Sequence, residues 1–255
     1  MSKMQMFSKT YAIVTGTSRG IGEAIASGLL RSGASVLGIA RSEAAATLAE
    51  HALYHHAQLD LTRVESATNW FEQEWKDERA ASCEQLLLIN NAGQLGGNRS
   101  IEHTRASELS DAMTVNATVP IWLMGFALRQ ERPKTTIVNI SSGAATSPYP
   151  GWGSYCPGKA ALEMAGQVLA EELKELPALQ DRHIHILSYS PGVVATAMQA
   201  EIRAADQADF PRLERFVALH RDGDLASPEA PANHLLSLVA DEAAPPYRVM
   251  RYTAE

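Results

Sequence analysis

The chain has 255 residues, of which 45% are hydrophobic and 20% charged, and this composition excludes wholesale disorder. The formal net charge of −7, from 22 basic and 29 acidic side chains, disfavours nucleic acid as a partner. No apolar run approaches the roughly 18 residues of a membrane span, and the first residues have no long apolar core. We therefore expect a cytoplasmic protein without a membrane partner.

Cysteine and histidine positions give no metal-binding pattern. The two cysteines, Cys83 and Cys156, lie far apart in the sequence, and the eight histidines are scattered. Structural zinc sites need closely spaced ligand pairs, which these positions do not form. We therefore expect no metal and interpret both cysteines as reduced thiols.

The first predicted elements are a strand, a glycine turn and a helix. Residues 10–15 form an apolar run, Gly16, Gly20 and Gly22 follow it, and apolar residues then recur at helical spacing up to Gly33. Glycines let the backbone approach a pyrophosphate, and a helix N-terminus offers it N–H groups and partial positive charge. The pattern predicts the start of a dinucleotide-binding fold, although the spacing alone is weakly specific.

A second strand, at 35–40, ends on Arg41. An acidic residue at this position would accept a hydrogen bond from the ribose of NAD, whereas a basic one suits the 2′-phosphate of NADP. Arg41 and Arg19 therefore predict a two-guanidinium clamp for that phosphate. The alternative is that both arginines are simply solvated.

The middle of the chain continues the alternation of strands and helices. A strand ends near Asp60 and Leu61, and Thr62 with Glu65 predicts a capping box that starts the next helix. Residues 86–89 are a continuous apolar run, as expected of a central parallel strand. Small polar residues follow it, at the end of the strand that would face a cofactor crevice.

A long helix is predicted from about residue 108 to 128, and it carries Asn116. Asparagine is a poor residue for a helix interior, because its side chain competes for backbone hydrogen bonds. We therefore expect a local distortion or a functional role at Asn116.

The most informative stretch follows the strand at 136–140. If Ser154 caps a helix over 155–175, Tyr155 and Lys159 lie one turn apart on one face. A tyrosine has a pKa of about 10, so its use near neutrality needs about 4 kcal/mol of phenolate stabilisation. A cation ~4 Å away at an effective dielectric constant of ~20 supplies that much. The pair predicts a proton donor to a carbonyl, with Ser142 holding the same oxygen, or else an ordinary surface pair.

The last part of the chain holds a strand at 183–189, a helix at 228–240 and a short strand at 248–252. Residues 197–226 mix charges with apolar residues, and we interpret them as a helical insertion that covers the pocket or as an ordinary surface helix pair. The alternation without a long linker predicts one α/β domain over 1–255, a Rossmann-like doubly wound parallel sheet of about seven strands with helices on both faces.

Taken together, the motifs resemble the short-chain dehydrogenases/reductases. The resemblance spans about residues 10 to 196 and is carried by Thr15-Gly16-x-x-x-Gly20-x-Gly22, Asn90-Asn91-Ala92-Gly93, Asn116, Ser142, Tyr155, Lys159 and Pro191-Gly192-x-x-x-Thr196. It implies Tyr155 as general acid/base, Ser142 as the group that orients the substrate oxygen, Lys159 as ribose ligand and cation, and Asn116 as holder of a relay water.

The same resemblance implies a set of residues that contact NADP(H). They are Gly16, Ser18, Arg19, Gly20, Ile21, Gly22, Arg41, Asp60, Leu61, Asn90, Ala92, Gly93, Tyr155, Lys159, Pro191, Gly192, Val194 and Thr196. Hydride transfer belongs to the cofactor, and the protein contributes placement and a polarised carbonyl.

A finer likeness is carried by Ser141-Ser142-Gly143-Ala144, Tyr149-x-Gly151-Trp152-Gly153-Ser154-Tyr155-Cys156 and Pro191-Gly192-Val193-Val194-x-Thr196-x-Met198-Gln199. These stretches resemble the sepiapterin-reductase-like branch, which includes bacterial benzil reductases. It implies an NADPH-dependent reductase of ketones or vicinal diketones, with substrate contacts from Ser142, Tyr149, Trp152, Tyr155 and Met198. The alternatives are a 3-oxoacyl-acyl-carrier-protein reductase and a non-catalytic NADP(H)-sensing protein. The resemblance also implies a homo-oligomer, although the chain lacks the family's frequent Val-Asp-Gly-Gly ending.

Overall fold

A seven-stranded parallel sheet forms the centre of the protein. The computed structural model describes residues 5–180 and 182–253. The strands are β1 (Thr10–Thr15), β2 (Ser35–Ala40), β3 (Tyr54–Gln58), β4 (Gln85–Asn90), β5 (Lys134–Ile140), β6 (His183–Ser190) and β7 (Tyr247–Arg251). Their order across the sheet is β3-β2-β1-β4-β5-β6-β7, with every neighbouring pair parallel. The predicted doubly wound fold is confirmed.

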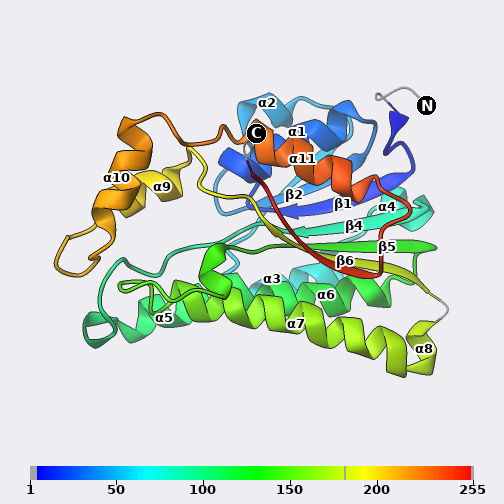
Figure 1. The fold of residues 1–255 in the computed structure, drawn as a ribbon. Helices are drawn as coiled ribbons and strands as arrows, with labels where there is room; N and C mark the ends of the chain where they lie inside the picture. The colour runs from blue at the N-terminus through cyan, green and yellow to red at the C-terminus, as the bar shows by residue number, and fades with distance from the viewer. Residues whose placement is uncertain (1–4, 181, 254–255) are drawn as a thin grey trace.

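Helices cover both faces of the sheet (Figure 1). The helices are α1 (Gly20–Arg31), α2 (Ala46–Ala49), α3 (Val64–Asn69), α4 (Glu78–Ser82), α5 (Ala106–Met113), α6 (Val119–Arg129), α7 (Tyr155–Glu175), α8 (Pro177–Gln180), α9 (Ala197–Arg203), α10 (Leu213–Arg221) and α11 (Glu229–Val239). Helices α1 and α11 pack on one face, and α3, α6 and α7 pack on the other.

Alternation along the strands divides the core into two layers. In β1, Ala12 and Val14 pack toward α1 and α11, whereas Tyr11 and Ile13 pack toward the opposite helices. Successive strand side chains point to opposite faces, so a strand covered on both sides must be apolar at every position. All six residues of β1 are buried, which matches this requirement.

The predicted helix over 108–128 is interrupted in its middle. Helix α5 is followed by a π-helical turn, Thr114–Thr118, before α6 begins at Val119. The distortion expected at Asn116 is confirmed, because Asn116 lies at the centre of this π turn. Its side chain bonds to the backbone of Gln94 rather than within its own helix.

The predicted capping box at Thr62 and Glu65 is wrong. The Thr62 backbone N–H and hydroxyl both donate to the Asp60 carboxylate, at 3.0 and 2.9 Å, so they form a turn at the end of β3. Helix α3 then starts at Val64, with Arg63 as its N-cap and no side-chain cap bond. The Asp60 carboxylate, two residues upstream, accepts the hydrogen bonds of Thr62 and so replaces the predicted helix cap.

The segment over 197–226 is helical, as predicted. Helices α9 and α10 lie beyond one end of the strands, away from the helices that cover the two faces (Figure 1). Helix α11 and strand β7 then complete the domain, close to their predicted positions.

Candidate active site

A cavity of about 800 Å³ opens at the carboxyl ends of the strands. In doubly wound sheets ligands bind in this crevice, because helices cover both faces of the sheet. Most of the predicted site residues line it: Gly16, Ser18, Arg19, Gly20, Ile21, Gly22, Arg41, Asp60, Leu61, Ala92, Gly93, Ser142, Tyr149, Trp152, Tyr155, Lys159, Pro191, Gly192, Val194, Thr196 and Met198.

Asn90 and Asn116 are the predicted residues that do not line the cavity. The Asn90 side chain is buried and donates to the Pro120 carbonyl and to Asn139 Oδ1. Asn116, also buried, accepts a hydrogen bond from the Gln94 N–H at 3.1 Å and donates to the Gln94 carbonyl at 2.7 Å. Both side chains therefore bond within the protein, and Asn116 holds the backbone of Gln94, which does line the cavity.

The glycine turn after β1 fits a phosphate group. Gly16 and Gly20 have φ angles of +76° and +63°, a region that side chains disfavour, and a Cβ at Gly22 would lie 2.1 Å from the Gly16 carbonyl oxygen. The N-cap residue of α1, Arg19, makes no side-chain cap bond. The first turn of α1 therefore presents backbone N–H groups to an anion at this end of the cavity.

Arg19, Arg41 and Asp60, which were predicted to meet the adenosine half of the cofactor, all line the cavity. The Arg41 carbonyl accepts a hydrogen bond from Gln58 Nε2 at 3.0 Å, which fixes the backbone after β2 while the Arg41 side chain remains exposed. Two guanidinium groups on one wall are the donor set that binds a phosphate dianion well.

Helix α7 delivers the predicted proton donor and cation. It begins at Tyr155, so Pro157 falls within its first turn, where a missing N–H costs little. Ser154 occupies the N-cap position, but its side chain makes no capping bond, and that part of the prediction is wrong. Tyr155 and Lys159 are 7% and 3% exposed, and Lys159 Nζ lies 5.8 Å from the Tyr155 ring centroid.

The lysine ammonium group is held by the backbone of the neighbouring strand. Lys159 Nζ donates to the Ile140 carbonyl at 2.8 Å. Ser142 follows two residues later, and its hydroxyl oxygen accepts a hydrogen bond from the Ala144 N–H at 3.2 Å. Thus the end of β5 and the start of α7 bring Ser142, Tyr155 and Lys159 to one wall of the cavity.

Burial governs the protonation of both groups. It raises the pKa of Tyr155 to about 12, with the Ser142 hydroxyl acting in the opposite direction. Burial also lowers the pKa of Lys159 to about 8. Burial is the largest cause of the raised pKa of Tyr155, and the Lys159 ammonium is directed at the Ile140 carbonyl. A lowering of the tyrosine pKa by the lysine stays a prediction. A phenol that keeps its proton remains competent to donate it.

Aromatic side chains build the opposite end of the cavity. The Trp152 ring stacks on Tyr149 and on Phe210, with centroids 4.7 and 5.3 Å away, and meets Tyr155 edge-on at 5.3 Å. Phe216, from α10, lies 5.5 Å from Trp152. This cluster gives the cavity an apolar, aromatic wall directly beside the proton donor.

Two arginines attach α10 to this aromatic wall. Arg212 places its guanidinium 4.5 Å from the Tyr149 ring centroid, and Arg215 Nη1 donates to the Tyr149 hydroxyl at 2.8 Å. Sequence reasoning missed these contacts. The mixture of charged and apolar residues over 197–226 predicted a helical segment that includes Phe210 and Phe216, but nothing in the sequence indicated which loop these rings would meet.

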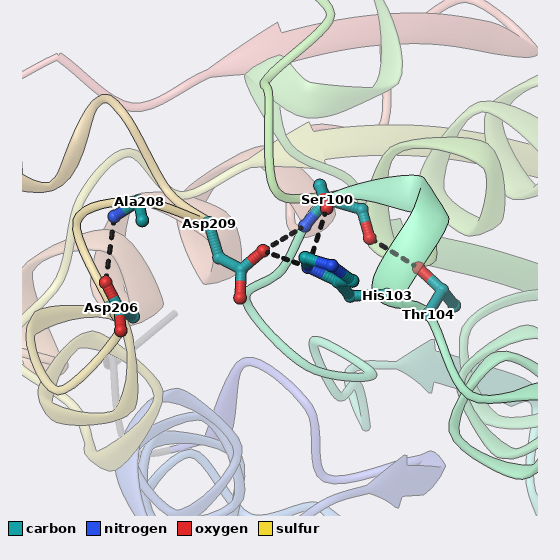
Figure 2. A network of polar contacts seen from close by, with 6 residues as sticks. All are labelled: Ser100, His103, Thr104, Asp206, Ala208 and Asp209. Carbon is teal, nitrogen blue, oxygen red and sulfur yellow. Dashed lines mark hydrogen bonds and ion pairs between the residues drawn. The ribbon is translucent and has the colours of Figure 1, made fainter.

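A polar network, which we call the clasp, joins residues 100–104 to residues 206–209 (Figure 2). Asp209 Oδ1 accepts from the Ser100 N–H at 3.1 Å and contacts His103 Nδ1 at 3.0 Å. This contact raises the pKa of His103 and lowers the pKa of Asp209. Asp209 directly precedes Phe210, which stacks on Trp152, so the clasp fixes the chain next to the aromatic cluster.

The described residues contain no group of three or more histidine, cysteine, aspartate or glutamate side chains placed to hold a metal ion. Within the same part of the chain, no helix is long and apolar enough to cross a membrane.

The fold and the site together define a nicotinamide-dependent oxidoreductase. The chain belongs to the short-chain dehydrogenase family, whose model matches residues 10–207. Members of this family use nicotinamide cofactors and act on carbonyl or alcohol groups, so both properties extend to this chain.

Among its relatives is benzil reductase ((S)-benzoin forming) of Bacillus cereus, which is 35% identical over 250 residues, or 94% of this chain and 98% of the relative. Sepiapterin reductase of Xenopus laevis is 30% identical over 249 residues, covering 91% and 90% of the two chains. The crystal structure of the KRED1-Pglu enzyme is 30% identical, with a TM-score of 0.75 over 94% of this chain and all of that one.

Proposed function

We propose that the protein is an NADPH-dependent carbonyl reductase that converts aromatic ketones or vicinal diketones to alcohols. One observation carries the proposal: the buried phenol of Tyr155 lies between an aromatic wall and a glycine cradle within a continuous cavity. Similarity to a benzil reductase and to a sepiapterin reductase supports the same substrate class.

The proposed chemistry assigns a separate task to each side chain. Bound NADPH would supply the hydride to the carbonyl carbon. Tyr155 would donate its proton to the developing alkoxide, whose basicity far exceeds that of a phenolate with a pKa of about 12. Ser142 would hold the carbonyl oxygen, and the Lys159 ammonium would stabilise the phenolate that remains.

The proposed preference for NADPH over NADH rests on the residues at the end of the cavity that would hold the adenosine of the cofactor. Arg19 and Arg41 would bind the 2′-phosphate of NADPH, while Gly16, Gly20 and Gly22 would let the pyrophosphate approach the backbone. Asp60 and Leu61 would face the adenine, and Ala92 and Gly93 the middle of the cofactor. Pro191, Gly192, Val194 and Thr196 would contact the nicotinamide end, and Asn90 and Asn116 would act from behind the wall.

The segment 197–226 would cover the substrate. Met198, Ile202 and Phe216 line the aromatic end and come from α9 and α10. We also expect a homo-oligomer in the cytoplasm. The outer faces of α6 and α7 expose Ile121, Met164 and Val168, and size-exclusion chromatography with light scattering measures the oligomeric state directly.

A substrate panel tests the proposal. Oxidation of NADPH should be fastest with benzil and related aromatic diketones, slower with aliphatic diketones, and slowest with acetoacetyl thioesters. Faster turnover of the acyl thioesters would favour fatty-acid ketoreduction instead. NADPH binding without turnover of any carbonyl in the panel would favour a sensing role.

A further inference from the structure

A partly buried carboxylate lies one helical turn beyond Lys159. Glu163 of α7 accepts a hydrogen bond from the Ser141 hydroxyl, with an oxygen–oxygen distance of 2.7 Å. Ser141 is 3% exposed and Glu163 is partly buried. Because Tyr155, Lys159 and Glu163 are spaced by four residues, they share one face of the helix. The motif reasoning assigned no role to Ser141 or Glu163.

Ile140, the last residue of β5, and Ser141, which follows it, are fixed by three separate contacts. The Ile140 carbonyl accepts from Lys159 Nζ at 2.8 Å, and the Ser141 N–H donates to the Tyr189 carbonyl at 2.8 Å. The Ser141 side chain adds the bond to Glu163. Ser142, the next residue, follows directly from this fixed backbone.

A hydrogen bond to an ionised acceptor is about twice as strong as one between neutral groups, and its donor–acceptor distance is typically shorter. The Ser141–Glu163 contact therefore joins α7 to the strand end more firmly than an ordinary hydroxyl contact would. It lies beside the bond from Lys159 to Ile140, so two consecutive residues of the strand end are held by two consecutive turns of the helix.

We propose that Glu163 is a positioning residue: its bond to Ser141 sets the separation between Ser142 on the strand end and Tyr155 and Lys159 on the helix. The inference deepens the proposed reductase function and relies on it for the roles of those three groups. A misplacement of about 1 Å between reacting groups can cost about 100-fold in rate. The substrate and cofactor surfaces do not include the Glu163 carboxylate.

The test compares Glu163→Ala, Ser141→Ala, Glu163→Gln and the double variant Glu163→Ala/Ser141→Ala. Both single alanine variants should lower kcat by about 10- to 30-fold, with KM for benzil and Kd for NADPH within about twofold of the parent. Glu163→Gln keeps an acceptor oxygen and should recover kcat to within about threefold. The double variant should be no slower than the slower single one, because both remove one contact.

Matched controls separate positioning from general damage. Glu172→Ala, at an exposed position of the same helix, should leave kcat unchanged. Hydrogen exchange should accelerate in peptides that cover residues 139–146 in Glu163→Ala but not in Glu163→Gln, with thermal unfolding midpoints within a few degrees of each other.

Three results would overturn the inference: parental kcat in Glu163→Ala, a Glu163→Gln variant as slow as Glu163→Ala, or losses that multiply in the double variant. If the parent protein reduced no carbonyl compound, the proposed function would fail on its own. Hydrogen exchange over 139–146 would then still decide whether Glu163 fixes the strand end.

Discussion

One end of the cavity is built mainly from backbone and glycines, and the other end is built from side chains. The end that we propose for the cofactor uses backbone and glycines at the ends of β1, β2 and β4, which are fixed by the sheet itself. The end that we propose for the substrate uses side chains from the loop at 149–154 and from α9 and α10. Aromatic stacking joins Trp152 to Phe210 and Phe216, and the clasp fixes Asp209 beside Phe210. The first end suits a ligand shared by a whole family. The side chains of the second end can vary without disturbing the first.

The largest effect is expected where the two ends meet. Tyr155→Phe removes the proton donor but keeps the ring that packs on Trp152. We expect kcat for benzil to fall by about 10² to 10⁴, while NADPH binding, measured by fluorescence titration, stays within about twofold. Parental turnover in this variant would refute the role of the phenol.

At the cofactor end, Arg41→Asp should reverse the cofactor preference. Charge-assisted hydrogen bonds contribute about 1.5–3 kcal/mol, so kcat/KM for NADPH should drop by roughly 10- to 100-fold while that for NADH changes little or rises. Arg63→Asp makes the same charge change outside the cavity and should leave the ratio of the two cofactors unaltered. An unchanged ratio in Arg41→Asp would contradict the clamp.

At the substrate end, Trp152→Leu should affect aromatic substrates selectively. Loss of an aromatic contact costs about 0.5–1.5 kcal/mol, so KM for benzil should rise by about three- to tenfold. KM for 2,3-butanedione and Kd for NADPH should remain close to the parental values. Equal losses for both diketones would mean that Trp152 maintains the fold of the loop rather than binding rings.

The smallest expected effect is a pH dependence of KM for benzil that comes from the clasp. The pKa of His103 is raised in the folded protein, so the His103–Asp209 ion pair is fully present below the unfolded pKa of about 6.5 and is lost as pH rises through the folded value. KM for benzil should therefore rise about two- to threefold between pH 6 and pH 8.

Two variants isolate the clasp's charge. Asp209→Asn removes the ion pair and should make KM for benzil independent of pH over that range. Asp206→Asn, in the same segment but bonded to the Ala208 N–H, should retain the parental pH dependence (Figure 2). A pH dependence that survives in Asp209→Asn would assign it to another group.

Sequence patterns predicted the cofactor end better than the substrate end, for a physical reason. The glycine turn and the Tyr155–Lys159 spacing are local, and backbone geometry within one turn follows from them. The stacking of Phe210 on Trp152, and the bond between Ser141 and Glu163, join residues 58 and 22 positions apart after folding.

The spacing of Tyr155 and Lys159 places them one turn apart, but it predicts neither their burial, which raises the pKa of Tyr155, nor the hydrogen bond from Lys159 to Ile140. Similarly, Thr62 looked like a helix cap because the pattern of residues 62–65 contains no information about the competing Asp60 carboxylate. A local sequence pattern predicts a hydrogen bond or a pKa correctly when no distant group and no stronger hydrogen-bond partner acts on the same side chain.

The order of the strands also bears on how the sheet can be assembled during synthesis. From β1, the chain adds β2 and then β3 at one edge, and afterwards β4, β5, β6 and β7 in turn at the other. No strand is ever inserted between two that already pair. A growing chain on the ribosome can therefore extend the sheet by edge addition alone, and β7 pairs last, covering the open edge of β6 and becoming an edge strand itself.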